Sequence, residues 1–194
     1  GAGAAKRAAE LEADRKVWDA VPMRSGRFMD ELAARLSEHA IIFDEALTSS
    51  PALTRHMPPS QPGHFFQNRG GSLGVGFPGA IGVKLANPGK PVIAFSGDGG
   101  SMYTIQALWT AARHGVDVKF VVCNNASYQY LQWNITQYWK ETGVAPHPYP
   151  LSFDLSYPAL RFDAMARSMG VQSVRVEQPS EIAGAIAAML SHDG

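Results

Sequence analysis

The stretch Val92-Ile-Ala-Phe-Ser-Gly-Asp-Gly-Gly100 decides the fold of this 194-residue chain. Its first four residues are a continuous apolar run, which is typical of a strand covered on both faces of a parallel sheet. A Gly-Asp-Gly-Gly turn follows at once, and the residues after it predict a helix. Asp98 therefore falls at the carboxyl end of a strand, where open α/β sheets place their ligands.

Strands and helices alternate along the rest of the chain, which is typical of an α/β domain. The apolar runs predict a doubly wound, mainly parallel sheet with helices on both faces. We expect strands over residues 40–44, 65–67, 92–95, 118–123 and 173–176. We expect helices over residues 3–20, 26–38, 73–85, 102–114, 128–139, 159–169 and 179–190. Ser25 is the predicted N-cap of the second helix.

The chain divides into a short connector and one domain. Residues 1–22 are charged and rich in alanine, and we interpret them as a connector helix from a preceding domain. Residues 23–194 suffice to bury the core of one domain. The last predicted helix runs into Ser191-His192-Asp193-Gly194, although the rhythm of the earlier units requires a strand there. We therefore expect this domain to be cut before a last strand.

Composition excludes several classes of function. Lysine plus arginine and aspartate plus glutamate both number 17, so a zero net charge offers no field for nucleic acid or an anionic membrane. No apolar stretch reaches the roughly 18 residues of a membrane span, and the start lacks the apolar core of a signal peptide. Cys123 is the only cysteine, which excludes an internal disulfide and indicates a buried thiol. We expect a cytoplasmic protein.

A second polar pair, Asn124-Asn125, follows the next apolar run. The 27-residue step from Asp98 to Asn125 holds a helix that climbs ~21 Å and a strand that returns ~20 Å. The two loops therefore meet at one edge of the sheet. Carboxylate and amide oxygens suit Mg²⁺, which is usually held by one or two carboxylates plus phosphate oxygens. The glycines let backbone amides approach a diphosphate at the start of a helix.

Gly-Asp-Gly followed about 27 residues later by Asn-Asn resembles the signature of the diphosphate-binding (PP) domain of thiamine-diphosphate-dependent enzymes. The stretch from about Gly63 to Trp133 is similar to the branch of benzoylformate decarboxylase and acetolactate synthase. The resemblance implies the thiamine-diphosphate-binding fold, with thiamine diphosphate and Mg²⁺ as cofactors. It implies that Asp98, Asn125 and the backbone carbonyl of Ser127 hold the metal. It places these further residues at the cofactor: Thr48, Ser49, Gly97, Gly99, Gly100 and Tyr128.

The segment Gly71-Ser72-Leu73-Gly74 resembles the turn on which this family bends its cofactor. By that resemblance, Leu73 props thiamine in a V shape, and the carbonyl of Gly71 accepts a hydrogen bond from the aminopyrimidine. The bend brings the 4'-amino nitrogen beside C2 of the thiazolium, so the cofactor itself removes the C2 proton. Leu73 and Gly71 are therefore the expected catalytic residues, and they act through conformation.

The resemblance also implies a reaction and partners. It implies a decarboxylase, lyase or carboligase that cleaves or forms carbon–carbon bonds next to the carbonyl of a 2-oxo acid or related acyl donor, with an aldehyde as acceptor. It places Tyr130, Leu131 and Asn134 at the substrate pocket, and His147 is a further candidate contact. The expected partner is a pyrimidine-binding domain on another segment or subunit, within a homodimer or homotetramer. Neither nucleic acid nor a membrane is expected.

Two other functions stay open on the sequence alone. Residues Gly74 to Gly79 fit the pattern G-x-G-x-x-G, and Asp98 lies 19 residues further on, so an NAD(P)-binding oxidoreductase domain is formally available. No convincing strand precedes these glycines, however, and this reading gives Asn124-Asn125 no role. The second alternative is a non-catalytic module that binds the cofactor and serves assembly.

Overall fold

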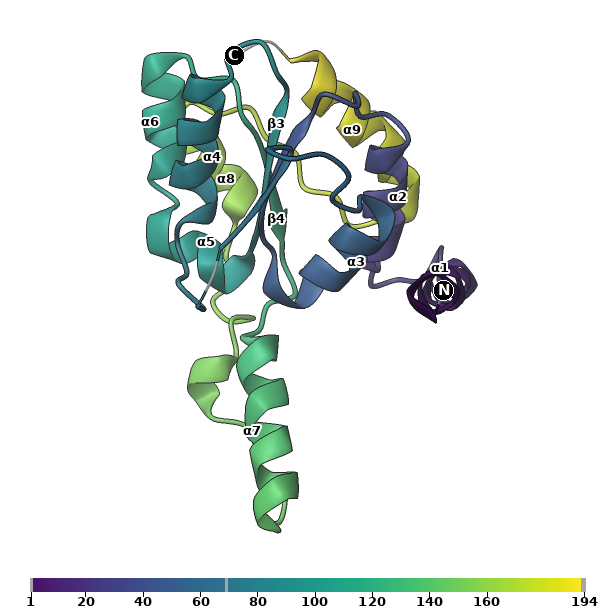
Figure 1. Cartoon of the computed structure of the whole chain (residues 1–194). Helices are drawn as coiled ribbons and strands as arrows, with labels where there is room; N and C mark the ends of the chain where they lie inside the picture. The colour runs from purple at the N-terminus through teal and green to yellow at the C-terminus, as the bar shows by residue number, and fades with distance from the viewer. Residues whose placement is uncertain (1, 69, 193–194) are drawn as a thin grey trace.

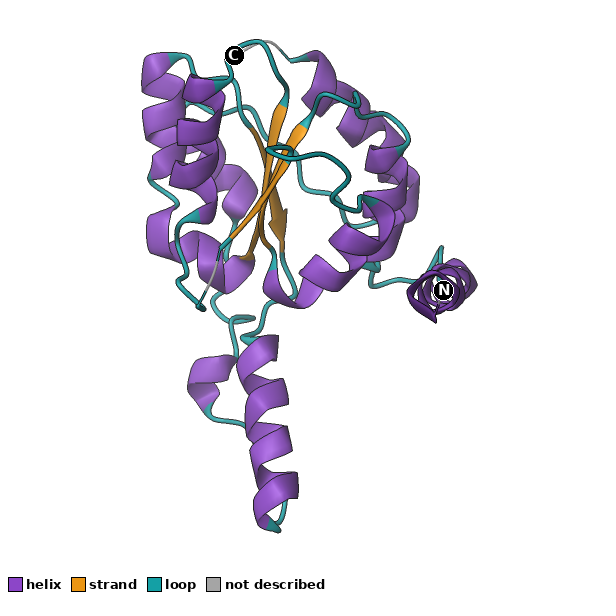
Figure 2. Ribbon diagram, in the orientation of Figure 1, coloured by secondary structure: helices purple, strands orange, loops and turns teal. Residues whose placement is uncertain are grey.

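The computed structural model describes residues 2–68 and 70–192. Four parallel strands form its sheet in the order β2-β1-β3-β4, as Figures 1 and 2 show. The strands are β1 (Ile41–Glu45), β2 (Phe65–Gln67), β3 (Val92–Gly97) and β4 (Lys119–Cys123). Each was predicted to within one or two residues; at their carboxyl ends β1 and β3 run one and two residues further than predicted.

The register of the sheet brings the carboxyl ends of three strands to one edge. Glu45 of β1 lies opposite Ser96 of β3, and Gly97 of β3 lies opposite Cys123 of β4. The loops after these strands therefore emerge side by side, which is the arrangement that the Asp98 to Asn125 spacing predicts.

Nine helices are described, and most of them cover the two faces of the sheet. They are α1 (Ala2–Lys16), α2 (Ser25–Ala33), α3 (Ser50–His56), α4 (Gly76–Ala86), α5 (Asp98–Thr104), α6 (Ala107–His114), α7 (Gln129–Thr142), α8 (Phe162–Ser168) and α9 (Ile182–Ser191). Short 3-10 turns are η1 (Leu47–Ser49), η2 (Leu151–Phe153) and η3 (Pro179–Glu181). In Figure 1, α4, α6 and α8 lie on one face of the sheet, and α2, α3 and α9 lie on the other. The predicted doubly wound α/β fold is confirmed. No helix in the described ranges is long and apolar enough to cross a membrane.

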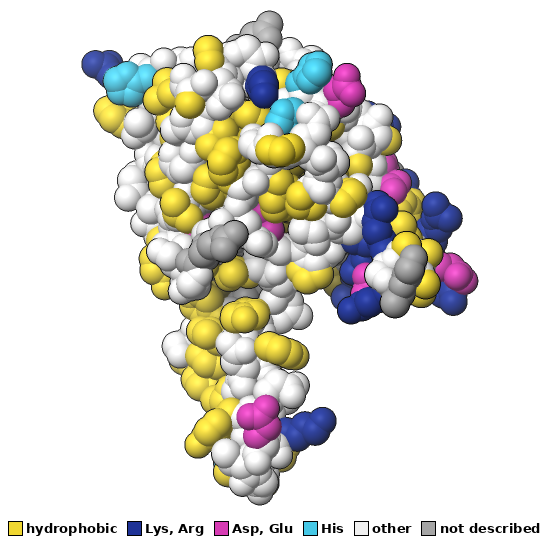
Figure 3. Space-filling view, viewed as in Figure 1, with side chains coloured by type: hydrophobic (Ala, Val, Ile, Leu, Met, Phe, Trp, Pro, Cys, Tyr) yellow, Lys and Arg dark blue, Asp and Glu magenta, His cyan; other side chains and the backbone are white. Residues whose placement is uncertain are grey.

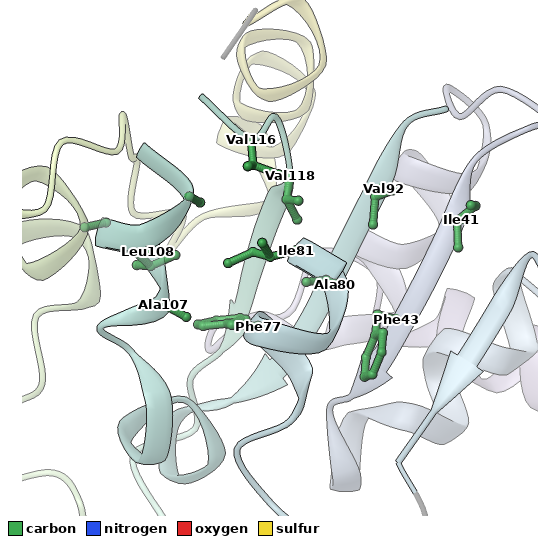
Figure 4. Packing of buried hydrophobic residues seen from close by; sticks show 13 residues of the cluster. Ile41, Phe43, Phe77, Ala80, Ile81, Val92, Ala107, Leu108, Val116 and Val118 are labelled. Carbon is green, nitrogen blue, oxygen red and sulfur yellow. The ribbon is translucent and has the colours of Figure 1, made fainter. Parts of the chain in front are cut away.

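Neighbouring residues of one strand point into different cores, which is why the apolar runs are continuous. Ile41 and Phe43 pack with Phe77 in the core under α4 and α6, part of which Figure 4 shows. Ile42 instead joins Leu32 of α2 in the core on the opposite face, together with residues of α9. The sheet therefore buries apolar side chains on both faces.

Several predicted element boundaries were wrong. The helix over 102–114 is two helices, and α4 begins at Gly76 because a glycine-rich turn precedes it. Ser25 is the first residue of α2 and not its cap, since Arg24 holds that position without a side-chain cap hydrogen bond. That helix also ends at Ala33, short of Glu38.

Residues 173–176 do not form the predicted strand. In the described part of the chain, the sheet ends at β4, and a cavity of about 890 Å³ lies between β4 and residues 171–178. A strand needs a neighbouring backbone for its hydrogen bonds. Among the described residues, the segment 173–176 pairs with no strand of the sheet, so its strand-like sequence does not make it a strand.

An arm, which we define as residues 129–153 and which contains α7 and η2, extends away from the sheet (Figure 1). Large apolar side chains remain exposed along it, among them Tyr130, Trp133 and Tyr138, and Figure 3 shows apolar side chains over this region. Trp139 is the buried residue of α7, and it stacks on Tyr149 with ring centroids 5.9 Å apart. The arm therefore has a small apolar centre of its own.

Candidate functional site

Asp98 and Asn125 meet at the carboxyl edge of the sheet. Asp98 begins α5 directly after β3, and Asn125 follows β4 by two residues. The backbone N–H of Ser127 donates to Asp98 Oδ2 at 3.2 Å and to Asn125 Oδ1 at 3.0 Å. One amide nitrogen therefore lies within hydrogen-bond distance of both side-chain oxygens, so the two side chains converge on one point.

The loop after β4 is held in a tight shape by local hydrogen bonds. Asn124 Oδ1 accepts the N–H of Ala126 at 2.9 Å, and Ala126 adopts a left-handed conformation with φ of 57°. On its other side, the carbonyl of Ala126 accepts the N–H of Leu155 at 2.9 Å. Such strain in a non-glycine residue persists where the surroundings fix it, often at a functional site.

Ser127 carries an unpartnered polar atom at this point. Its Oγ is the one buried side-chain oxygen without a hydrogen-bond partner among the residues that the structure describes. Buried hydroxyls are normally satisfied, so this one indicates a place for a bound water, ion or ligand oxygen. Together with the converging oxygens of Asp98 and Asn125, it gives a donor set that fits a hard cation.

The charge of Asp98 lacks a cationic partner in the described ranges. Its side chain is only 4% exposed, and burial raises the pKa of the Asp98 carboxyl, while N–H bonds from Gly99 and Ser127 oppose the shift. A buried carboxylate without a counter-charge is costly, and a divalent cation would supply that charge. The described residues hold no cluster of three histidines, cysteines or acids, so this site would combine acid, amide and carbonyl oxygens.

The candidate diphosphate-binding residues border the same edge. Gly99 lies under the ring of Tyr128, since a Cβ there would stand 2.3 Å from Tyr128 Cε1. Gly97 precedes α5 and accepts a hydrogen bond from the Ser101 hydroxyl at 2.7 Å. Gly100 follows in the first turn of α5, and Thr48 and Ser49 lie in η1, directly after β1. All of these positions follow the carboxyl ends of β1, β3 or β4.

Cys123 ends β4 beside this site, where it is partly buried and not fully buried as the sequence indicates. Its thiol is nevertheless expected to be unreactive. Burial, with the negative charges of Asp44 and Asp98, raises the pKa of Cys123 to about 12 despite a hydrogen bond with Ser49. Because the thiolate is the nucleophile, alkylation by iodoacetamide at pH 8 should be roughly a thousandfold slower than for free cysteine. Mass spectrometry can follow the labelling, with urea-unfolded chain as the control. A rate within tenfold of free cysteine would contradict this expectation.

Glu45 is a residue of this edge that the sequence analysis missed. It ends β1, is 2% exposed, and accepts backbone N–H groups from Gly74 at 2.6 Å and Val75 at 3.1 Å on Oε1 and from Gly76 at 2.9 Å on Oε2. The sequence feature that could have indicated Glu45 is the acid pair Asp44-Glu45, which directly follows the apolar residues 41–43. Its partners lie about 30 residues away, so no local pattern connects them.

The same contacts remove the dinucleotide interpretation of residues 74–79. That interpretation requires the amides at the start of α4 to bind a pyrophosphate. Those amides are instead bound to the carboxylate of Glu45, which would repel an anion. Gly79 serves packing, because a Cβ there would stand 2.6 Å from Cζ of Phe43 in the core.

The candidate substrate residues are not gathered into a pocket by the described chain. Tyr130 and Leu131 on the arm are 47% and 43% exposed, and Asn134 is exposed as well. His147 packs edge-on against Trp139 with ring centroids 5.7 Å apart, which gives it a structural contact. Gly71 is exposed and Leu73 is half-buried in the turn before α4, so both are accessible to a ligand.

Known proteins are similar to this chain in sequence and in fold. The family model described as "Thiamine pyrophosphate enzyme, C-terminal TPP binding domain" matches residues 48–194. Benzoylformate decarboxylase of Pseudomonas aeruginosa is 33% identical over 172 residues, which cover 89% of this chain and 31% of that protein. The large subunit of acetolactate synthase isozyme 1 of Escherichia coli is 32% identical over 130 residues, which cover 66% of this chain and 23% of that protein.

A solved structure agrees with these matches. The thiamine diphosphate-dependent 4-hydroxybenzoylformate decarboxylase of Rhodococcus jostii RHA1 has a TM-score of 0.78 and 27% identity, over 90% of this chain and 32% of that one. The chain thus spans about a third of the length of this benzoylformate decarboxylase and of this solved structure. It belongs to the thiamine pyrophosphate enzyme family, as the cofactor-binding C-terminal domain of that family.

Proposed function

We propose that the carboxyl edge of the sheet is the Mg²⁺ and diphosphate site of this domain. Asp98 and Asn125 would bind the metal through side-chain oxygens, and Ser127 would bind it through its backbone carbonyl. The observation that carries this proposal is the amide of Ser127, which lies within 3.2 Å of both side-chain oxygens. The unpartnered Ser127 Oγ and the uncompensated charge of Asp98 support it.

The remaining residues would hold the organic part of the cofactor. The amides of Gly99 and Gly100 at the start of α5, with Gly97, Tyr128 and the hydroxyls of Thr48 and Ser49, would bind or enclose the diphosphate. When bound, thiamine diphosphate supplies a carbon nucleophile and an electron sink for chemistry next to a carbonyl. The chain would supply conformation: Leu73 would support the bent cofactor, and the carbonyl of Gly71 would accept from its aminopyrimidine.

The complete protein is proposed to be a carbon–carbon lyase or carboligase that acts on a 2-oxo acid or related acyl donor. The names of its relatives, decarboxylases and acetolactate synthases, support this class. Tyr130, Leu131 and Asn134 would border the substrate only when another chain or domain covers the exposed arm. That partner would be a pyrimidine-binding domain in a homodimer or homotetramer. By the resemblance to this family, it would supply a glutamate that hydrogen-bonds the pyrimidine ring of the cofactor.

We further propose that residues 1–22 connect this domain, residues 23–194, to a preceding one. Helix α1 is held by charged contacts, since Arg55 of α3 pairs with Asp14 at 2.5 Å and with Glu10 at 3.3 Å. Its sequence has no sharp apolar stripe of its own. A non-catalytic assembly module is the second candidate function, and turnover by the complete protein would exclude it.

Replacing Leu73 by alanine should separate binding from chemistry. The diphosphate contacts lie elsewhere and the carbonyl of Gly71 stays in place, so the Mg²⁺-dependent affinity of this chain for thiamine diphosphate should fall by less than about tenfold. Turnover by the complete enzyme should fall by more than about tenfold. Calorimetry and steady-state kinetics measure the two quantities. Full turnover in the variant would contradict the assigned role.

Thermal unfolding with different ligands tests the proposed function. A ligand that binds only the folded state raises the unfolding midpoint by mass action. We expect thiamine diphosphate with Mg²⁺ to raise it, and the same cofactor with EDTA to raise it far less. NAD(H) should have no effect. A rise with NAD(H) and none with thiamine diphosphate would reject the proposal.

A further inference from the structure

Glu45 places a buried negative charge directly under the turn that precedes α4. The groups compensating it among the described residues are N–H and O–H donors: the amides of Gly74, Val75 and Gly76, the Ser96 hydroxyl at 3.3 Å and the Asn68 side-chain amide at 3.5 Å. A carboxylate that accepts several backbone N–H groups at the start of a helix is well stabilised and fixes those groups in place. The turn is therefore built around one side chain of β1.

Two glycines let the backbone of the turn lie close to this carboxylate and to α5. A Cβ on Gly76 would stand 2.5 Å from Glu45 Oε2. Gly74 has φ of +92°, and a Cβ there would stand 2.9 Å from the Cβ of Tyr103. From the side of α5, the Thr104 hydroxyl donates to the carbonyl of Gly74 at 2.8 Å. Glu45 and Thr104 thus hold the turn from two sides.

This turn carries the residues assigned to the ring half of the cofactor and not those assigned to the metal. Leu73 directly precedes Gly74, and Gly71 lies two residues before Leu73. The hydrogen bonds that join the metal-loop residues involve Asp98, Asn125 and Ser127. Glu45 contacts none of these three through a hydrogen bond in the described ranges. Loss of the Glu45 hydrogen bonds should therefore displace Leu73 and Gly71 and leave the metal loop in place.

We infer that Glu45 is a positioning residue, which holds the turn at residues 74–76 so that Leu73 and the carbonyl of Gly71 meet the ring half of thiamine diphosphate. This role rests on the proposed function above. Glu45 would act by fixing the position of this turn, and it makes no hydrogen bond to the metal-loop residues in the described ranges. Its replacement should therefore lower the affinity for thiamine diphosphate and leave the affinity for inorganic diphosphate nearly unchanged.

The test compares two ligands on the 194-residue chain with Mg²⁺ by calorimetry: thiamine diphosphate and inorganic diphosphate. In Glu45→Gln, the amide NH₂ would face backbone N–H groups, so one strong acceptor is lost. We expect affinity for thiamine diphosphate to fall about tenfold and affinity for inorganic diphosphate to change less than about twofold. An unchanged ratio of the two affinities would overturn the inference.

Asp44→Asn is the matched control. Asp44 neighbours Glu45, is fully buried, and accepts hydrogen bonds from Ala46 at 2.9 Å and Gln67 at 2.8 Å, but none from residues 74–76. Any effect of this variant should be equal for the two ligands. The inference would be overturned if Asp44→Asn lowered the ratio of thiamine diphosphate affinity to inorganic diphosphate affinity as much as Glu45→Gln does. The loss of any buried acid in this strand would then explain the effect.

A second variant keeps the test decisive if Glu45→Gln does not fold. Thr104→Val removes the hydroxyl that holds the carbonyl of Gly74 from α5, at a half-buried position. It should lower the affinity ratio in the same direction by a smaller factor, and an unchanged ratio would contradict the positioning role of this turn. Wild-type chain that binds neither ligand would reject the proposed function itself, and the role of Glu45 with it.

Discussion

Replacing Asp98 by alanine should abolish Mg²⁺-dependent binding of thiamine diphosphate, with a loss of affinity of more than about 100-fold. The variant removes the one carboxylate of the proposed donor set, and its oxygen also orients the amide of Ser127. The fold should survive, because Asp98 lies at a loop end and burial already raises the pKa of its carboxyl in the free chain. Calorimetry at matched Mg²⁺ measures the affinity, and circular dichroism checks the fold.

Asn125→Leu should behave in the same way, since it removes an oxygen ligand and offers no replacement. Asp154→Asn serves as the control, because Asp154 lies opposite Ser127 while its own side chain accepts the N–H of Ser156. Its affinity should stay close to that of the wild type. Unchanged affinity in Asp98→Ala would remove the metal assignment, whatever the control shows.

Replacing Gly79 by alanine should destabilise the domain by about 2 kcal/mol, because the core is closed at this point. The new Cβ would stand 2.6 Å from Cζ and 2.7 Å from Cε2 of Phe43, a rigid ring that is 8% exposed. The ring stacks on Phe66 with centroids 6.2 Å apart, so it has little room to turn away. The unfolding midpoint should fall by roughly 4–8 °C in a thermal melt.

Gly82→Ala provides the opposite case in the same helix. Gly82 is exposed in the interior of α4, and a Cβ there meets no heavy atom within 4 Å. Alanine at such a position should stabilise the domain by up to ~1 kcal/mol through helix propensity. Equal midpoints for the two variants would contradict the close packing of α4 on β1.

The placement of Asp98 and Asn125 could be predicted from the sequence because it depends on regular geometry alone. The rise of a helix and the rise of a strand determine where the chain returns, and one apolar run with a polar end marks each strand. The carboxyl ends of β3 and β4 consequently lie side by side in the structure. Residue types at those ends then define the chemistry that is available.

Features that depend on distant partners could not be predicted in this way. The bonds of Glu45 to Gly74 and Gly76 join segments that only the tertiary fold brings together. Residues 173–176 have a strand-like composition, but a strand also requires a neighbour, and a cavity separates them from β4. The exposure of Tyr130 on the arm likewise reflects how α7 leaves the sheet, which no pattern within the helix encodes.

A crystal structure of this chain with Mg²⁺ and thiamine diphosphate tests the central claim most directly. The account predicts a metal ion about 2.0–2.1 Å from a side-chain oxygen of Asp98, the side-chain oxygen of Asn125 and the backbone carbonyl of Ser127, with the diphosphate against the start of α5. A metal ion bound away from Asp98 and Asn125, or a diphosphate at the start of α4 in place of the Glu45 carboxylate, would contradict it.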